Sequence, residues 1–164
     1  MKNITSLLLA AALSAPAAAA LAESAPVTVT GKIVGVTCSI RNADLDYPLG
    51  VVKQADFVGG VSPWVTNALV SGGCDAARVE MRFASAADSI NTALFATQGA
   101  ARGVAIELQT AAGEAIVPND STPVSWGAQP AGGEYQFRAR YRQTGASMMP
   151  GPADATVAVT IDYI

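Results

Sequence analysis

The sequence predicts an all-β sandwich, and three observations support this fold class. Valine and threonine are concentrated in short runs, and the longer runs alternate apolar and polar side chains as strands with one buried face do. Gly-Gly pairs and prolines separate these runs, and both residue types favour turns over continuous strands. No segment carries a long apolar repeat with the 3.6-residue period of a helix.

The first 22 residues have the features of a secretory signal peptide. Lys2 supplies a positive start, residues 4–13 form a short apolar run, and Ala20-Leu21-Ala22 is a small-x-small cleavage site. The run is too short and too rich in alanine for a membrane anchor. Cleavage after Ala22 would leave residues 23–164, which is enough chain for one domain with its own core. We therefore expect an exported, soluble protein without a direct membrane anchor.

The stretch directly after the expected cleavage site changes its pattern halfway. Small or apolar residues occupy odd positions up to residue 33, whereas from Val34 onward they occupy even positions. A one-residue slip turns every side chain to the opposite face of a strand, so residues 25–33 and 34–40 cannot form one regular strand facing one core. Two explanations remain open at this point: a β-bulge at a sheet edge, or an N-terminal arm that pairs with another molecule.

Six main strands are expected after this stretch. The alternation is clearest in the third, fourth and fifth, whereas the apolar residues of the second are spaced too irregularly to predict its facing. The six strands are residues 34–40, 64–70, 78–83, 104–109, 134–142 and 156–164. Between them we expect short extended pieces at 49–52 and 115–117, a loop at 56–63, room for a helical turn in 84–102, and a proline-broken connection at 118–130.

The predicted strand set is incomplete at one end. An immunoglobulin-like sandwich needs about seven strands, and only six are found. The last strand alternates through Val157, Val159, Ile161 and Tyr163 and stops at Ile164 without a polar tail. Unless another strand covers it, this strand presents an open edge, which proteins usually protect. The sequence therefore indicates a missing strand near one terminus and a spare strand near the other.

Cys38 and Cys74 are the two cysteines of the chain. An even number of cysteines in an exported protein favours a disulfide; two free buried thiols are the alternative. The net charge of the whole chain is −3, which gives no reason to expect a nucleic-acid partner. Arg138, Arg140 and Arg142 alternate along one predicted strand and do not form a basic patch interleaved with aromatic residues.

The sequence lacks the residues that most catalytic sites need. It contains no histidine, which removes the common general base, the Ser-His-Asp and Cys-His systems and most transition-metal sites. Asp44, Asp46 and Asp120 lie in turn contexts, where carboxylates usually cap turns. Trp64 and Trp126 are able to stack on a sugar, but such rings in a small β domain more often pack in the core or at its rim. We therefore expect no enzyme, no metal and no cofactor.

Several segments in combination resemble the subunits of chaperone–usher pili, and the resemblance extends over the whole chain after the signal peptide. Gly31 or Cys38 alone would be a weak signal, whereas the set with its two C-terminal residues is specific. The segments are Gly31-Lys32-Ile33-Val34, Cys38, Leu49-Gly50-Val51-Val52, Cys74, residues 104–108, residues 137–141, Gly151 as the fourteenth residue from the end, and the penultimate Tyr163.

The resemblance implies an incomplete immunoglobulin-like β-sandwich of six strands, with the seventh supplied by another molecule. A periplasmic pilus chaperone would fill the gap during folding, and at the outer-membrane usher the arm of a neighbouring pilin subunit would replace it. The implied domains are the signal peptide (1–22), an N-terminal donor-strand extension (23–33) and a pilin domain (34–164). The implied function is that of a structural subunit of an adhesive cell-surface fimbrium, exported through the periplasm.

The resemblance also implies roles for individual residues. Glycine would be required in the donor strand where a neighbour's core leaves no room for a β-carbon. The inserting residues would be Ala25, Val27, Val29, Gly31 and Ile33. The groove-lining and chaperone-contacting residues would be Gly151, Val157, Val159, Ile161, Tyr163 and Ile164.

Within this family, the chain is most similar to minor tip-fibrillum subunits of type 1 pili. The short arm, the Gly31-Lys32-Ile33-Val34 motif and Ala86-Ala87-Asp88-Ser89 carry this similarity. One alternative is a major pilus rod subunit, whose arm is usually longer. The other is a secreted β-sandwich adhesin that binds carbohydrate through Trp64 or Trp126.

Overall fold

The computed structural model describes residues 37–164. The predicted signal peptide and the predicted donor residues Ala25, Val27, Val29, Gly31 and Ile33 lie outside the described residues. Within the described part, no helix is long and apolar enough to cross a membrane.

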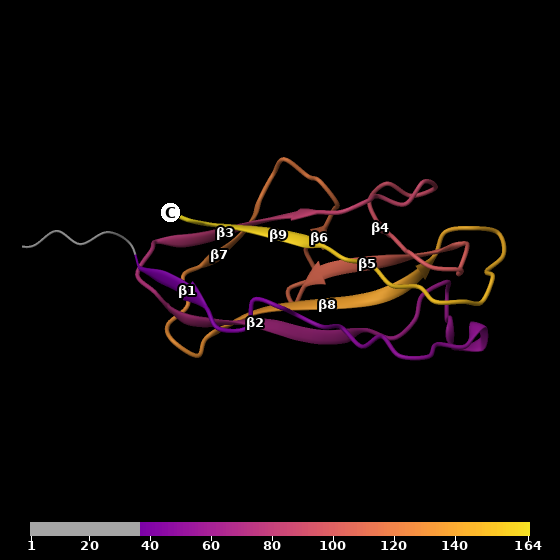
Figure 1. The fold of residues 1–164 in the computed structure, drawn as a ribbon, viewed down its shortest axis with the longest axis horizontal. Coiled ribbons are helices and arrows are strands. Elements are labelled where there is room, and N and C mark those ends of the chain that lie inside the picture. The colour runs from indigo at the N-terminus through magenta and orange to yellow at the C-terminus, as the bar shows by residue number, and fades with distance from the viewer. Residues whose placement is uncertain (1–36) are drawn as a thin grey trace, which may run out of the picture. The chain divides into compact units, whose positions relative to one another are not determined.

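Two antiparallel sheets form the domain (Figure 1). The larger sheet has the order β1-β2-β8-β5-β4, with β6 also paired to β5, and the smaller has the order β7-β3-β9. The elements are β1 (Cys38–Ile40), the 3-10 turn η1 (Gln54–Asp56), β2 (Val65–Cys74), β3 (Arg78–Ala84), β4 (Phe95–Ala96), β5 (Val104–Thr110), β6 (Ala115–Ile116), β7 (Val124–Gly127), β8 (Glu134–Gln143) and β9 (Ala158–Tyr163).

The core lies between the two sheets and follows from the alternation of their strands. In β3, Val79 and Met81 are completely buried, while the charged residues that alternate with them, Arg78, Glu80 and Arg82, are more exposed. Phe137 of β8 faces them from the larger sheet, and its ring meets that of Phe83 edge to face at 5.8 Å between centroids. Tyr135 beside it is also completely buried. The predicted all-β sandwich is therefore confirmed.

Five of the six predicted main strands correspond to β2, β3, β5, β8 and β9, but several connections differ from the prediction. The connection at 118–130 contains the strand β7, which pairs with β3. Its prolines flank the strand and do not interrupt it, which is how proline is tolerated at a sheet edge. The stretch 84–102 contains the short strand β4 and one hydrogen-bonded turn at 91–94 but no helix, and residues 49–52 form no strand. The turn η1 instead begins just before the predicted loop at 56–63.

A disulfide joins Cys38 of β1 to Cys74 of β2. The two residues lie directly opposite each other in the β1–β2 ladder, so the bond holds the short first strand against the second. The prediction of one disulfide is confirmed, and the described residues contain no free cysteine.

Candidate functional site

In the part of the chain that the structure describes, one long edge of the smaller sheet is open. Among residues 37–164, β3 is the only strand that pairs with β9. Ile164 and Arg78 exchange both of their backbone hydrogen bonds, so in an antiparallel ladder every second residue counted back from Ile164 also bonds to β3. The residues between them, Val159, Ile161 and Tyr163, therefore direct their N–H and C=O groups toward the open edge.

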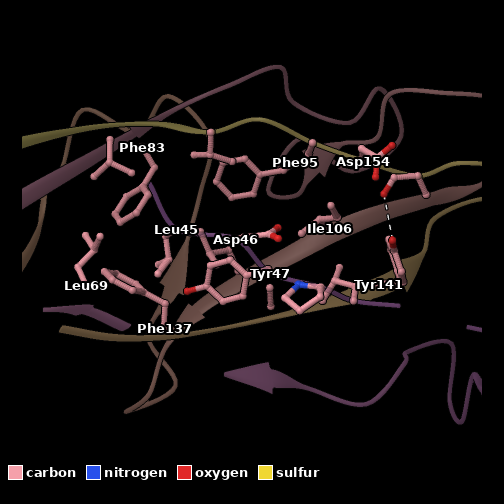
Figure 2. A pocket seen from close by; sticks show the side chains of 18 of the residues that line it. Leu45, Asp46, Tyr47, Leu69, Phe83, Phe95, Ile106, Phe137, Tyr141 and Asp154 are labelled. Carbon is pink, nitrogen blue, oxygen red and sulfur yellow. Dashed lines mark hydrogen bonds between the residues drawn. The ribbon is translucent and has the colours of Figure 1, made fainter. Parts of the chain in front are cut away.

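A groove of about 660 Å³ runs beside this edge, between the two sheets. Its walls come from β9 and the residues before it, from the core strands, and from the segment 40–50 (Figure 2). The residues that line it are mostly apolar. They include Ile40, Leu45, Tyr47, Leu49, Leu69, Phe83, Phe95, Ile106, Leu108, Phe137, Ala139, Tyr141, Ala155, Val157, Val159 and Ile161.

The apolar side chains of β9 are less covered than those of its neighbour. Val159 is 39% exposed, whereas Val79 and Met81 on β3 are completely buried. Val157 and Ile161 are only partly buried, although both pack against the core. An apolar strand face with both an uncovered surface and free backbone groups is the surface that strand addition requires.

The side chain of Tyr47 projects into the groove (Figure 2). Its hydroxyl is buried and has no hydrogen-bond partner among the described residues, and burial raises the pKa of this phenol well above its ordinary value. Tyr141, at the far end of the groove, donates its hydroxyl to the carbonyl of Ala153 at 3.1 Å. Burial, together with the charge of Asp154, raises the pKa of Tyr141.

A second hollow of about 490 Å³ continues from one end of the groove. The two share Gly50, Tyr141, Ala153 and Asp154. Gly151 lies in this hollow and not on β9. A β-carbon at Gly151 would lie 2.7 Å from the nitrogen of Ala101, so glycine is needed there for a close backbone approach.

The remaining predicted residues lie on or beside the edge strand. Val157, Val159 and Ile161 line the groove. Tyr163 packs against the core, and burial raises the pKa of its phenol. Ile164 is 48% exposed and is bound through its backbone to Arg78.

Sequence reasoning missed the groove wall formed by the segment 40–50. Asp44 and Asp46 of this segment are predicted to lie in turns, yet Leu45, Tyr47 and Leu49 pack against the core. A signal for it exists in the sequence, because these three apolar residues alternate with polar or small ones.

The two tryptophans have protein partners. The ring of Trp126 contacts those of Tyr135 and Phe137 edge to face, with centroids 6.1 and 5.3 Å apart. The guanidinium carbons of Arg138 and Arg140 lie 4.5 and 4.0 Å from the ring centroid of Trp64. Both rings are therefore engaged in packing or cation–π contacts.

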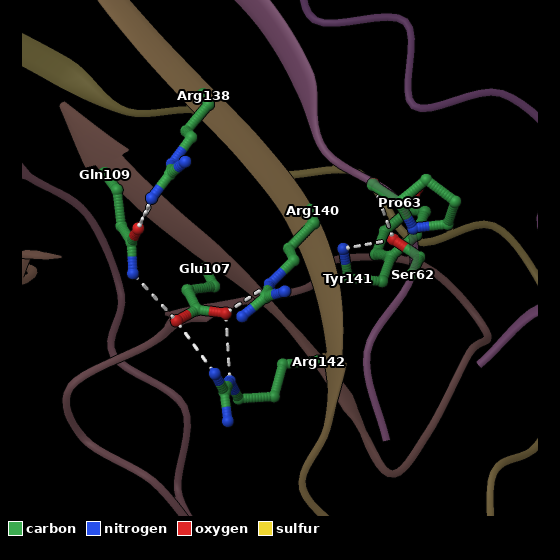
Figure 3. Close-up of polar contacts among 8 residues, drawn as sticks. All are labelled: Ser62, Pro63, Glu107, Gln109, Arg138, Arg140, Tyr141 and Arg142. Atoms are coloured by element: carbon green, nitrogen blue, oxygen red, sulfur yellow. Dashed lines mark hydrogen bonds and ion pairs between the residues drawn. The ribbon is translucent and has the colours of Figure 1, made fainter. Parts of the chain in front are cut away.

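A polar network covers the outer face of β5 and β8 (Figure 3). The Glu107 carboxylate accepts hydrogen bonds from Arg140 at 2.6 Å and from Arg142 at 2.9 and 3.0 Å. Burial acts to raise the pKa of Glu107, but the hydrogen bonds and charges of the two arginines outweigh it and hold this pKa below its usual range. The network is a paired structural element on the side of the sheet opposite the groove.

The described residues offer no arrangement suited to metal binding. No group of three or more histidine, cysteine or acidic side chains lies close enough to hold an ion in the part of the chain from 37 onward. The distinctive feature of the site is the apolar groove beside the open edge of β9.

The known proteins that are similar to this chain in sequence and in fold include subunits of fimbriae and pili. A family model described as "Fimbrial protein" matches residues 27–164. The chain is 29% identical over 167 residues to "Fimbrial subunit type 1" of Salmonella typhimurium, covering 90% of both proteins. It is 26% identical to "Protein FimG" of Escherichia coli (strain K12), covering 94% of both. The solved structure of the P pilus rod subunit PapA has a similar fold, with a TM-score of 0.64 at 21% identity over 77% of this chain and 99% of that one.

Proposed function

This chain belongs to the fimbrial protein family and is a structural pilus subunit, and we propose that it is assembled by donor-strand exchange. It associates with other pilin subunits in a surface pilus and is not an enzyme. In the proposed assembly, the residues 23–33 of one subunit fill the groove beside β9 of the next. The same residues would thereby complete the core of a neighbour.

The observation that carries this proposal is the coincidence of two properties on β9. Val159 and Ile161 turn their backbone groups to the open edge and also line the groove with their side chains. An added strand would gain backbone hydrogen bonds and apolar burial at the same positions. The region 25–33 supplies the matching alternation of small or apolar residues with mostly polar ones.

In the proposed assembly the added strand runs antiparallel to β9, as strands do in the sheets of an immunoglobulin-like sandwich. Residues that lie opposite each other in an antiparallel pair point to the same face. We place Val29 opposite Val159, which sets Gly31 opposite Val157 and Ile33 opposite Ala155. All three recipient residues line the groove.

The proposed assembly route requires two further partners. A periplasmic chaperone would cover the apolar groove until a neighbouring subunit arrives, and an outer-membrane usher would be the place of exchange. The exposed Ile164 places the terminal carboxylate where basic chaperone residues are able to bind it. The route leads from the periplasm to the cell surface, where the fimbrium contributes to adhesion.

Within the pilus we place this subunit in the tip fibrillum. About eight residues separate the expected cleavage site from Gly31, and a short arm is typical of this position. The alternative is that this chain is a subunit of the pilus rod.

The decisive experiment removes residues 23–33 from the mature chain and expresses the product with its chaperone. The truncated subunit should fold, bind the chaperone and accept a peptide of residues 23–33, but it should fail to enter a neighbour's groove. A matched pair of peptides tests the facing: Val29→Asp should abolish uptake because it buries a charge, while Thr28→Asp should bind as the natural peptide does. If the truncation unfolds the domain in the chaperone complex, the arm belongs to its own core and the proposal fails.

A further inference from the structure

We infer that the second hollow is a docking surface for the body of the neighbouring subunit whose arm fills the groove. We call this the junction surface and define it as Val51, Val52, Phe57, Met148, Met149 and Pro150. The inference rests on the proposed donor-strand assembly, but it concerns a contact that the arm itself does not make.

The junction surface gathers exposed and partly buried apolar side chains from two distant parts of the chain. Val51 is 97% exposed and Met149 is 60% exposed, and both line one hollow of about 490 Å³. Single exposed apolar residues are ordinary, but several that converge on one concave surface indicate a binding surface.

Backbone hydrogen bonds hold both parts of this surface in place. Met149 exchanges two backbone hydrogen bonds with Arg102, at 3.0 and 3.2 Å. On the other side, Asp56 accepts a hydrogen bond from the backbone of Lys53 at 2.7 Å and thereby closes the turn η1 next to Val52. The surface is therefore formed before any partner arrives, which lowers the entropy cost of binding.

The position of the junction surface identifies its occupant. In the proposed register, Ile33 of the neighbour lies beside Ala155, and each further residue extends the chain by about 3.3 Å. The neighbour's chain then leaves the groove past Asp154 and Ala153, which belong to both the groove and the hollow. The first part of the neighbour to reach the hollow is the region where its own arm joins its domain.

The described chain begins at Thr37, at the end of the domain opposite to the junction surface (Figure 1). The backbone of Asp75 donates to Thr37, and the backbone of Ala77 donates to Ile164, so the start of β1 and the end of β9 meet there. Ile164, at 48% exposure, supplies apolar surface at this end. The occupant is thus this end of the neighbouring pilin subunit, in a head-to-tail contact.

The test compares an arm peptide with an intact subunit on the same recipient. The recipient variant Val51→Asp/Met149→Asp places two charges on the junction surface. Both side chains are exposed in the single subunit, so the charges should not impair folding. The matched controls are Val58→Asp and Ile90→Asp, at 80% and 65% exposure, neither of which lines the groove or the hollow.

The measured quantities are the dissociation rates of the 23–33 peptide and of an intact mature subunit delivered as its chaperone complex. All variants should release the peptide at the wild-type rate. The double variant should release the intact subunit about tenfold faster, while the two controls should not change this rate.

Two results would overturn the inference. An unchanged release of the intact subunit from the double variant would show that the hollow makes no contact with the neighbour's body. An equal acceleration for the peptide would assign the hollow to the arm site. Failure of the wild-type recipient to bind the peptide is a different result, because it rejects donor-strand exchange itself.

Discussion

Val159 lies directly opposite Phe83 in the β3–β9 ladder, yet Phe83 is 5% exposed and Val159 is 39% exposed. The two side chains belong to the same face of the smaller sheet. Phe83 lies on β3, which has a strand on each side, whereas Val159 lies on β9, which is the edge strand in the described domain. The difference in exposure between these two paired side chains marks the position where a further strand would cover β9.

Val159→Asp should leave folding of the single subunit nearly unchanged and prevent filling of the groove. The carboxylate is hydrated while the groove is open, but it would be buried unpaired under an added strand, at a cost of several kcal/mol. Affinity for the 23–33 peptide should fall by more than about a hundredfold, as measured by fluorescence titration. Thr160→Asp is the control, because Thr160 is next to Val159 in the strand and its side chain points to the opposite, exposed face. This variant should bind the peptide normally. Equal loss of affinity in both variants would contradict the facing of β9.

Tyr47→Phe should stabilise the subunit whose groove is empty. The buried hydroxyl of Tyr47 lacks a hydrogen-bond partner in the described structure, and an unsatisfied buried hydroxyl costs about 1 to 3 kcal/mol. The urea midpoint of the peptide-free domain should therefore rise. Tyr141→Phe serves as the comparison, because it removes a hydroxyl that does donate a hydrogen bond, and its midpoint should fall. A lower midpoint for Tyr47→Phe would show that the hydroxyl has a partner.

Glu107→Gln should reduce the pH dependence of stability at acid pH. Since the pKa of Glu107 is lower in the folded protein, its carboxylate stabilises the fold above its unfolded value of about 4.3. This contribution is lost as the pH falls through the folded pKa. The variant should be less stable than the wild type at neutral pH, by roughly 2 kcal/mol for its weakened charged hydrogen bonds.

The difference should shrink as the pH is lowered from 5 toward about 3. Urea unfolding of the two proteins across this range measures it, with Glu114→Gln as a control at an exposed carboxyl that forms no ion pair in the described structure. A constant difference over the whole range would contradict the assigned role of the Arg140 and Arg142 pairing.

Replacing Cys38 and Cys74 by serine should lower stability substantially. The bond spans a sequence separation of 36 residues, and the chain-entropy model gives roughly 4 kcal/mol for a loop of this size. The urea midpoint of the double variant should fall, and a reducing agent should produce the same loss in the wild type but none in the variant. An unchanged midpoint would mean that the β1–β2 ladder holds without its covalent link.

The strands with strict alternation were predictable because their side chains report directly which face is buried. Residues 78–83 and 104–109 lie within β3 and β5, and the last predicted strand, 156–164, contains β9. These predictions depend only on local period-2 patterns, which a strand with one buried face enforces.

The short edge elements were not predictable in the same way. The strand β7 has four residues between prolines and gains its place from pairing with β3. Tyr47 and Leu45 lie among turn-forming residues, and their burial depends on the groove that distant strands create. In both cases the deciding interactions are between residues distant in the sequence. The local turn-forming residues therefore predicted a turn or a loop and not a strand or a buried side chain.

The disulfide also determines how a fibre bears tension. A pull on the arm would enter the described domain at Thr37 and reach first the three-residue strand β1, whose few hydrogen bonds to β2 would be loaded in shear. The sulfur bridge lies one residue beyond Thr37 and passes the force by a covalent path to β2. From there it spreads into the long β2–β8 ladder. The short strand β1 is thereby taken out of the mechanical path.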